Sequence, residues 1–361
     1  MKSLISVVCL MLLAGGMPAG ARTHVLFTVD VESFSEGDPA KQIWGEVGQK
    51  GERWGITRLM DIFEAAGVRA TFYLNVYEIA RNGEEPIRAA AREIHRRGHD
   101  LQLHSHPQPM FPMRGRWHGN LALQTEMLSR GMDLLRRWTG RAAIAHRASY
   151  RVDSDTLRAE RQAGIPVDAT FTWVPPDRPA GRDGAGLGNT VQKSTGVIHL
   201  PATYYAQLRL GPWASHRLVD IEGSTEAELT TILDQAARAG LCTVNIVLHS
   251  FSLSRYGVPD PAVARRLRNV LAYARSQSLL MPVTTTEIYE AIVGRDVCAG
   301  EKPFVPTTGP MLTYARAVED VDKGWKNKLA VAAPMLAVLL LSGAIVLFFR
   351  RRQSQRRTRV L

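Results

Sequence analysis

Two pairs of chemically active residues in this sequence each have a spacing of two. Asp30 and Glu32 follow the apolar stretch 24–29, and His104 and His106 follow the alternating stretch 99–103. Residues two apart in an extended strand point to the same side, so each pair presents both side chains to one face. Two imidazoles and one carboxylate can hold zinc with a position open for water, and a second carboxylate can act as a base. Taken singly, such residues are more often strand caps or ordinary surface residues.

Arg147 and His249 also stand at the ends of apolar stretches. Arg147 lies in "HRASY", and His249 ends the strongly apolar stretch 241–248. An arginine at such a position can orient a carboxylate through two parallel hydrogen bonds. A histidine there can act as a general acid near neutral pH. The alternative interpretations are a surface ion pair for Arg147 and a capping histidine for His249.

The stretches that carry these residues are expected to be strands of a parallel α/β fold. Apolar strand patterns alternate with helical patterns along the chain, and about seven such units favour a barrel. In such barrels the chemistry gathers at the carboxyl ends of the strands, where all of these residues lie. The expected strands are 24–30, 69–75, 99–105, 142–148, 165–171, 196–202 and 241–250, and the expected helices are 55–67, 85–98, 120–140, 154–164, 225–240, 260–277 and 284–294.

Both ends of the chain have the composition of membrane-targeting segments. Residues 1–21 combine Lys2, an apolar run and small residues near Ala21, which predicts a cleaved signal peptide, with an uncleaved anchor as the alternative. Residues 329–349 form an uncharged run long enough to span a bilayer, and the tail 350–361 is rich in arginine. The positive-inside rule therefore predicts a single-pass cell-membrane protein with a cytoplasmic C-terminus. Its domain, 22–300, is then extracytoplasmic, and 301–328 is a linker.

The charge of the chain is concentrated in its tail. The whole sequence has a formal net charge of +11, whereas residues 23–327 hold 36 Lys and Arg against 34 Asp and Glu, a net +2. This balance argues against a nucleic-acid partner, which requires a basic face on the domain. After cleavage only Cys242 and Cys298 remain. They are equally compatible with a disulfide and with two free thiols.

In the order carboxylates, histidines, arginine, histidine, these motifs resemble those of the NodB-homology polysaccharide deacetylases, the carbohydrate esterase family four group. The resemblance covers about residues 24–295. It implies a distorted (β/α)7-type barrel, here with one C-terminal transmembrane helix. It also implies metal-dependent removal of N-acetyl groups from N-acetylhexosamine units of a polysaccharide or other glycan. The alternatives are an O-acetyl esterase acting on a polysaccharide, and a non-catalytic carbohydrate-binding scaffold with a degenerate metal site.

The resemblance also implies roles for individual catalytic residues. Asp30 matches the general base, and Arg147 matches the arginine that positions it. Tyr150 matches the residue whose backbone N–H holds the oxyanion, and His249 matches the general acid. Asp168 is expected to orient His249.

The implied metal ion is zinc, with cobalt and nickel as alternatives. Glu32 matches the metal carboxylate, and His104 in "GHDLQLHSH" matches the first metal histidine. The second histidine of the family pattern falls on Gln108, so His106 is the available imidazole and His118 is the alternative. The predicted ligands are therefore Glu32, His104 and His106.

Overall fold

The computed structural model describes most of the chain between residues 22 and 332. The described residues are 22–33, 38–47, 52–107, 110–111, 119–149, 154–170, 188–194, 196–210, 213–255, 258–319, 328–329 and 331–332. The predicted signal peptide, nearly all of the predicted membrane segment and the arginine-rich tail lie outside them. Within this part of the chain, no helix has the length and apolar character needed to cross a bilayer.

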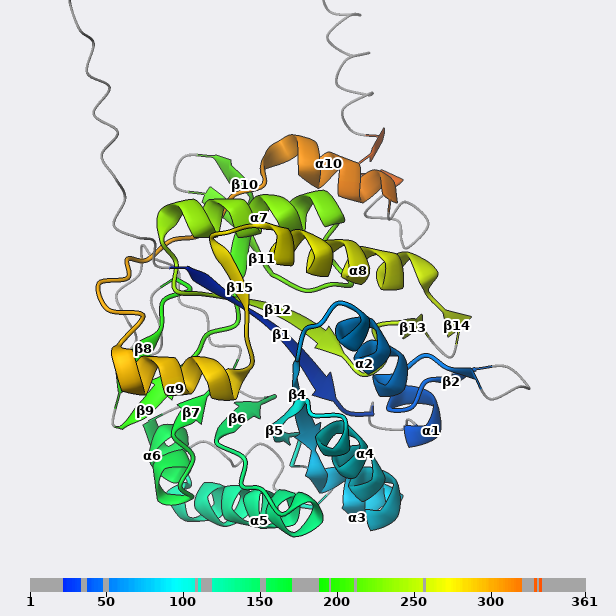
Figure 1. Cartoon of the computed structure of the whole chain (residues 1–361), viewed down its shortest axis with the longest axis vertical. Helices are drawn as coiled ribbons and strands as arrows, with labels where there is room; N and C mark the ends of the chain where they lie inside the picture. Colours follow the sequence, from blue (N-terminus) through cyan, green and yellow to red (C-terminus); the bar gives the residue numbers. More distant parts are fainter. Residues whose placement is uncertain are drawn as a thin grey trace, which may run out of the picture.

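The core of the fold is a curled sheet of nine strands, most of them parallel (Figure 1). The strand order is β12-β1-β4-β5-β6-β7-β9-β8, and β15 pairs with the first residues of β1. The strands are β1 (Thr23–Val31), β4 (Thr71–Asn75), β5 (Asp100–Ser105), β6 (Ala145–Ala148), β7 (Val167–Asp168), β8 (Gln192–Ser194), β9 (Val197–His199), β12 (Thr243–His249) and β15 (Leu280–Pro282).

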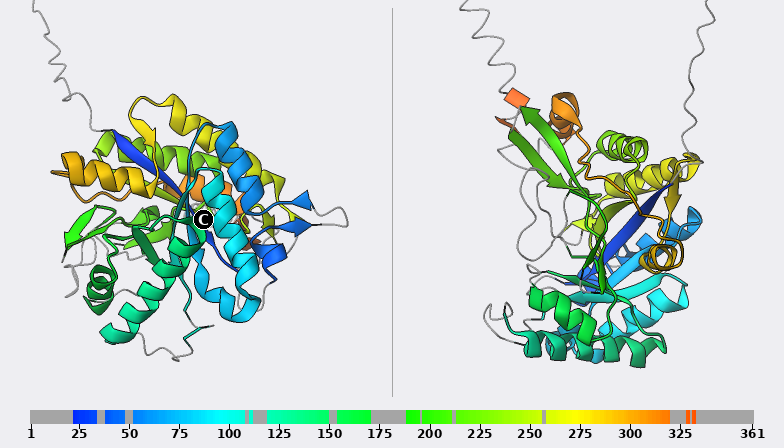
Figure 2. Two further views of the ribbon diagram at one scale, coloured as in Figure 1. Left: turned by 60° about the horizontal axis from the view of Figure 1, so that its bottom comes forward. Right: turned by 90° about the vertical axis from the view of Figure 1, so that its left-hand side faces the viewer.

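Helices cover the outer side of this sheet (Figure 2). Helices that follow neighbouring strands of the sheet pack against each other. Helix α5 begins at an N-cap, Asn120, and α7 and α9 begin with capping boxes, so their first turns are stabilised locally. The predicted helices are all present, with boundaries shifted by at most three residues. They are α2 (Ile56–Ala65), α4 (Glu84–Arg96), α5 (Leu121–Thr139), α6 (Ser154–Gln162), α7 (Glu226–Ala239), α8 (Pro261–Ser276) and α9 (Thr285–Arg295).

Several shorter elements were not expected from the sequence. An antiparallel hairpin, β10 and β11, follows β9, and a helix, α10, packs against β10. These additional elements are α1 (Pro39–Gln42), β2 (Glu46–Val47), β3 (Glu52–Arg53), η1 (Val76–Glu78), α3 (Ile79–Asn82), β10 (Tyr204–Leu210), β11 (Trp213–Leu218), β13 (Ser254–Arg255), β14 (Val258–Pro259) and α10 (Gly309–Glu319).

Among the described residues the sheet curls but does not close, in contrast to the predicted barrel. Its path ends at β12 on one side and at the antiparallel strand β8 on the other. Strand–helix alternation holds from β1 to α6, but among the described residues no helix lies between β7 and β9, and the hairpin β10–β11 follows β9. Because a parallel barrel needs a crossover after each strand, the chain forms a half-barrel.

The predicted linker is folded onto the domain as far as Glu319. Cys242 and Cys298 form a disulfide, which settles the pairing that their spacing left open. Beyond it, Thr307 and Gln235 of α7 exchange hydrogen bonds, and α10 lies against β10. The folded unit therefore extends past the expected boundary at residue 300.

Candidate metal centre and acid–base site

The register of the sheet brings the predicted site residues to one edge. Asp30 of β1 is directly opposite His249 of β12, and His104 of β5 is directly opposite Arg147 of β6. Strand β4 lies between β1 and β5 and connects the two pairs within the same sheet. Because these strands are parallel, their carboxyl ends lie together, and side chains 117 residues apart in sequence come into contact.

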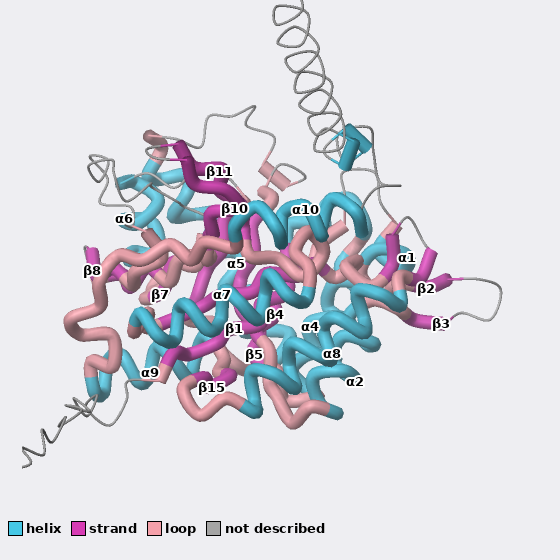
Figure 3. Tube along the Cα trace, turned by 90° about the horizontal axis from the view of Figure 1, so that it is seen from above, coloured by secondary structure: helices cyan, strands magenta, loops and turns pink. Residues whose placement is uncertain are grey.

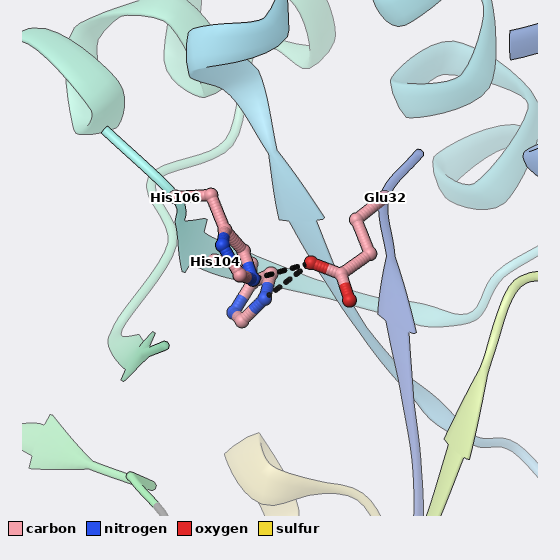
Figure 4. A group of neighbouring side chains, drawn as sticks. All are labelled: Glu32, His104 and His106. Carbon is pink, nitrogen blue, oxygen red and sulfur yellow. Dashed lines mark hydrogen bonds and ion pairs between the residues drawn. The ribbon is translucent and has the colours of Figure 1, made fainter. Parts of the chain in front are cut away.

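Glu32, His104 and His106 form a compact group of three potential metal ligands (Figure 4). Glu32 Oε2 lies 3.1 Å from His104 Nε2 and 2.6 Å from His106 Nε2. One ligand atom from each residue lies within 4.8 Å of the others. His104 is buried, whereas the His106 side chain is 41% exposed, so the group opens to solvent on the His106 side.

The donor chemistry of this group fits a divalent cation. The Nδ1 atom of His104 lies 2.8 Å from the Arg147 carbonyl oxygen, which assigns the Nδ1 proton to that bond. A neutral His104 then has no proton to donate from Nε2 to Glu32, and two lone pairs face each other. A cation between them removes this conflict, and the hydrogen bond at Nδ1 orients the ring for ligation.

The hydrogen bonds from the histidines also act on Glu32. Burial opposes ionisation of this carboxyl group, but when no cation is bound and the rings are protonated, the hydrogen bonds and charges of His104 and His106 outweigh burial and hold the pKa of Glu32 well below its usual range. The carboxylate is therefore charged at neutral pH, as a metal ligand must be. Ser250, at the end of β12, bonds the Glu32 carbonyl oxygen and fixes the backbone of this residue.

Asp30 and Arg147 form a fully buried ion pair beside the metal ligands. Arg147 Nη1 donates to Asp30 Oδ1 at 2.7 Å, and neither side chain is more than 2% exposed. The remaining guanidinium nitrogens donate to the Ala169 carbonyl oxygen and to Thr28 Oγ1, and the guanidinium lies 4.1 Å from the centroid of the Tyr73 ring. Arg147 therefore compensates the buried charge of Asp30 and fixes its orientation, which excludes a surface ion pair.

His249 lies near the carboxylate oxygen of Glu32 that the other two histidines do not contact. Its Nε2 atom lies 4.0 Å from Glu32 Oε1, its Nδ1 atom lies 3.2 Å from Glu222 Oε1, and its ring stacks on Phe251. Burial lowers the pKa of His249, but the bond to Glu222 and the charge of Asp30 outweigh burial and raise it to about 9. His249 is therefore protonated at neutral pH and can donate a proton from Nε2.

The expected partnership between Asp168 and His249 is wrong. Asp168 Oδ2 lies 2.7 Å from His199 Nδ1, and Glu222 takes the place beside His249. Asp168 is directly opposite His146 in the sheet, so the two side chains share a face. Arg147, the residue after His146, points to the other face, toward Asp30. Strand alternation therefore places Asp168 on the helix-facing side of the sheet, away from the site.

A second layer of polar residues supports the ligand loop. Asn75, at the end of β4, accepts a hydrogen bond from the His106 backbone and donates one to Glu78. Glu78 in turn accepts from the backbone and hydroxyl of Ser33, directly after Glu32. Burial raises the pKa of Glu78, although these hydrogen bonds oppose the shift. Asn75 stands at the end of a strand. The expectation that functional residues lie at strand ends, which selected His104, could therefore also have identified Asn75.

The opposite side of β5 is held by a buried chain of hydrogen bonds. Ser105, between the two metal histidines, bonds His146 Nε2 at 2.7 Å, and His146 Nδ1 bonds Glu160 of α6 at 2.7 Å. Burial lowers the pKa of His146 to about 3 and raises the pKa of Glu160 well above its usual value. Both groups are therefore neutral. The sequence showed His146 only as the neighbour of Arg147, and nothing local linked it to Glu160.

Two predicted site residues lie outside the described residues. Tyr150, the expected oxyanion donor, and His118, the alternative ligand, are both in stretches that the structure does not describe. Gln108 lies outside as well.

Comparison with solved structures identifies the fold. A protein of Mycobacterium smegmatis described as a polysaccharide deacetylase matches with a TM-score of 0.55 at 18% identity, over 80% of this chain and 96% of that one. A protein of Pseudomonas aeruginosa PAO1 with the same description matches with a TM-score of 0.50 at 15% identity, over 77% and 93%. No family model and no curated protein sequence matches this chain. At these identities the likeness shows a common fold.

Proposed function

We propose that this protein is a metal-dependent hydrolase that removes N-acetyl groups from N-acetylhexosamine units of a polysaccharide outside the cytoplasmic membrane. The observation that carries the proposal is the convergence of a buried carboxylate, a three-ligand group and a protonated histidine at one edge of the sheet. These are the parts that hydrolysis of an amide requires: a base, a cation site and an acid. The fold shared with the two structures described as polysaccharide deacetylases supports the substrate class.

Glu32, His104 and His106 would hold the metal ion. When bound, a zinc ion supplies a Lewis acid that polarises the acetamide carbonyl group and acidifies an attached water molecule. The ligand set of two imidazoles and one carboxylate suits zinc and leaves positions open for water and substrate. Nickel and cobalt accept the same donors.

Asp30 accepts the proton that the attacking water loses. Its carboxylate is already oriented by Arg147, which contacts Oδ1 and thereby leaves Oδ2 available for proton transfer. The new bond forms between the water oxygen and the carbonyl carbon of the acetamide. The base therefore needs no rearrangement before the reaction, because its hydrogen-bond partners are in place in the free protein.

His249 completes the reaction on the leaving-group side. The bond between carbonyl carbon and sugar nitrogen breaks, and the amine leaves poorly unless its nitrogen receives a proton. Protonated His249 can supply this proton from Nε2, while Glu222 holds Nδ1 and stabilises the charged ring. The products are acetate and a glucosamine-type unit, and one proton has passed from water to the amine.

The test is acetate release from N-acetylglucosamine oligomers and from an O-acetylated polysaccharide by the purified full chain, without metal and with added zinc or cobalt. We expect metal-dependent release from the amide substrate. Asp30→Asn and His249→Ala should lower kcat by about 10²- to 10⁴-fold with the metal still bound. His104→Ala should abolish metal binding.

The matched control is His95→Ala, which removes a histidine on α4 away from the site and should retain full activity. Release from the ester substrate alone would replace the proposal with an esterase. Zinc binding without release from either polymer would contradict hydrolysis and favour a carbohydrate-binding role.

A further inference from the structure

Helix α10 has an apolar outer face. Met311, Tyr314 and Val318 are 85%, 39% and 44% exposed, and their spacing of three and four residues aligns them on one side of the helix. The other large apolar side chains that are exposed among the described residues are separate from one another: Val258 on β14, Leu279 in the turn before β15, Val293 on α9 and Leu329 after α10. Isolated exposed residues of that kind are ordinary, whereas an aligned stripe indicates a contact surface.

Thr313 and Arg316 of α10 bond to the domain on the other side of the helix, and Glu319 at its end forms an ion pair with the domain while its side chain stays 55% exposed. Arg316 is buried and lies 3.4 Å from Glu228 of α7, which is fully buried. Thr313 donates to the carbonyl oxygen of Gln207 in β10, and Glu319 lies 3.6 Å from Arg266 of α8. The helix contains no charged residue besides Arg316 and Glu319.

This arrangement is the reverse of an ordinary surface helix, which buries its apolar side and exposes its charges. The charged groups of α10 form ion pairs with the domain, and the apolar face of the helix is directed outward. The helix lies at the top of the folded part in Figure 1, and the view from above in Figure 3 shows it beside β10 and α7. The apolar outer face of α10 is therefore accessible to an apolar environment.

The sequence that follows α10 indicates that this environment is a lipid bilayer. The uncharged run Leu329–Phe349 begins ten residues after Glu319, and ten residues reach at most about 35 Å. Trp325, Lys326 and Lys328 stand directly before the run, as is typical of residues at a membrane surface. The predicted membrane segment thus confines α10 to the neighbourhood of a bilayer.

We propose that the outer face of α10 lies in the boundary between lipid headgroups and acyl chains, beside the point where residues 329–349 enter the membrane. Met311, Tyr314 and Val318 insert, as the apolar side of an interfacial helix does. Because α10 is ion-paired to both α7 and α8, this contact fixes the orientation of the whole domain to the bilayer. The inference depends on the predicted membrane segment and is independent of the proposed hydrolase activity.

The test uses the full chain in vesicles of phosphatidylcholine and phosphatidylglycerol at a ratio of about seven to three. The disulfide leaves no free thiol in the domain, so in a Cys9→Ser background a single introduced cysteine can be labelled with an environment-sensitive fluorophore. The variants are Met311→Cys, Tyr314→Cys and Val318→Cys. The matched control is Val293→Cys, an apolar residue on α9 that is 64% exposed and lies outside the stripe.

We expect blue-shifted emission and at least twofold stronger quenching by spin-labelled lipids at the three α10 positions than at residue 293. Emission at these positions equal to that of the control would overturn the proposal. Efficient disulfide cross-linking between copies at residue 311, with protection from lipid quenchers, would instead assign the face to a second copy of the chain. Release of the full chain from vesicles by alkaline carbonate would also overturn it, since the segment that holds α10 at the bilayer would then be absent.

Discussion

His249 lies between two carboxylates, and this position decides its protonation. Glu222 contacts Nδ1 and Glu32 lies near Nε2, while burial alone would favour the neutral ring. The result is a pKa of about 9. A histidine that must donate a proton works only below its pKa, so the proposed activity should fall as the pH rises through this value.

Glu222→Gln should shift this loss of activity to lower pH. The amide keeps a hydrogen-bond acceptor but removes the negative charge, so the pKa of His249 decreases and the protonated form is lost earlier. We expect the alkaline limb of the kcat/KM profile to move down by about one pH unit, with the acid limb unchanged. Glu290→Gln, on the exposed side of α9, is the control. An unchanged alkaline limb would show that Glu222 does not set the protonation of the acid.

At the scale of elements, β5 carries His104, leads directly into His106 and is fixed from its opposite face. Ser105 connects this strand through His146 of β6 to Glu160 of α6, and all three side chains are buried. A buried polar chain of this kind is stabilising only while each member keeps its partner. The position of His104 and His106 therefore depends on Ser105, which lies between them in the sequence and faces away from the site.

Ser105→Ala should destabilise the protein and weaken metal binding. The substitution leaves His146 Nε2 without a partner in a dry environment, which costs about 1–3 kcal/mol. Denaturant unfolding of the metal-free protein measures the first effect, and calorimetric zinc titration measures the second. Ser276→Ala, at the exposed end of α8, should change neither. Equal unfolding midpoints for the Ser105 and Ser276 variants would contradict a structural role of the chain.

The carboxyl group of Glu301 joins the C-terminal segment to the sheet. Glu301 accepts hydrogen bonds from the backbone of Val191, beside β8, and of Cys242, beside β12. Burial raises the pKa of Glu301 from 4.5 to about 7, although both hydrogen bonds oppose the shift. Between these values the folded protein keeps a proton that the unfolded chain loses, so stability decreases as the pH rises.

The free energy of unfolding should therefore fall by up to about 3 kcal/mol from this group between pH 4.5 and pH 7. Glu301→Gln cannot lose the proton and should show a flatter dependence over the same range. Urea unfolding at several pH values compares the two proteins. Parallel curves would show that Glu301 does not retain its proton in the folded state.

At the scale of the whole molecule, a covalent bond joins the central sheet to the C-terminal segment. The disulfide links Cys242, at the start of β12, to Cys298, after α9, across a separation of 56 residues. A crosslink over a loop of this length stabilises a fold chiefly by restricting the unfolded chain. The same segment continues into α10, so the disulfide also supports the proposed membrane contact.

Cys298→Ala should lower the free energy of unfolding by about 2–4 kcal/mol. Guanidinium unfolding of the wild type under oxidising and reducing conditions, beside the variant, measures this loss. The reduced wild type should behave like Cys298→Ala, and the variant should not respond to the reductant. A variant as stable as the oxidised wild type would show that the crosslink adds nothing to this fold.

The sequence by itself determined the main helices and the same-face pairs. Side-chain alternation in strands is local, so the spacing of two was enough to predict that His104 and His106 face one side, and Asp30 and Glu32 likewise. Amphipathic periods and Gly or cap signals placed the main helices within three residues. The strand-end rule also placed Asp30, His104, Arg147 and His249 at one edge, because parallel strands share it.

Only the tertiary structure decided which of these residues become partners. Glu222 lies 27 residues before His249 in a stretch without a local signal, and a parallel bridge between Asp220 and Val247 of β12 brings it to the imidazole. The family resemblance implied that Asp168 orients His249, but strand register and alternation turn Asp168 toward His199. The disulfide and the outward apolar face of α10 depend on packing between distant segments. Local sequence fixes the direction of a side chain along its own strand, whereas the order of the strands fixes what it meets.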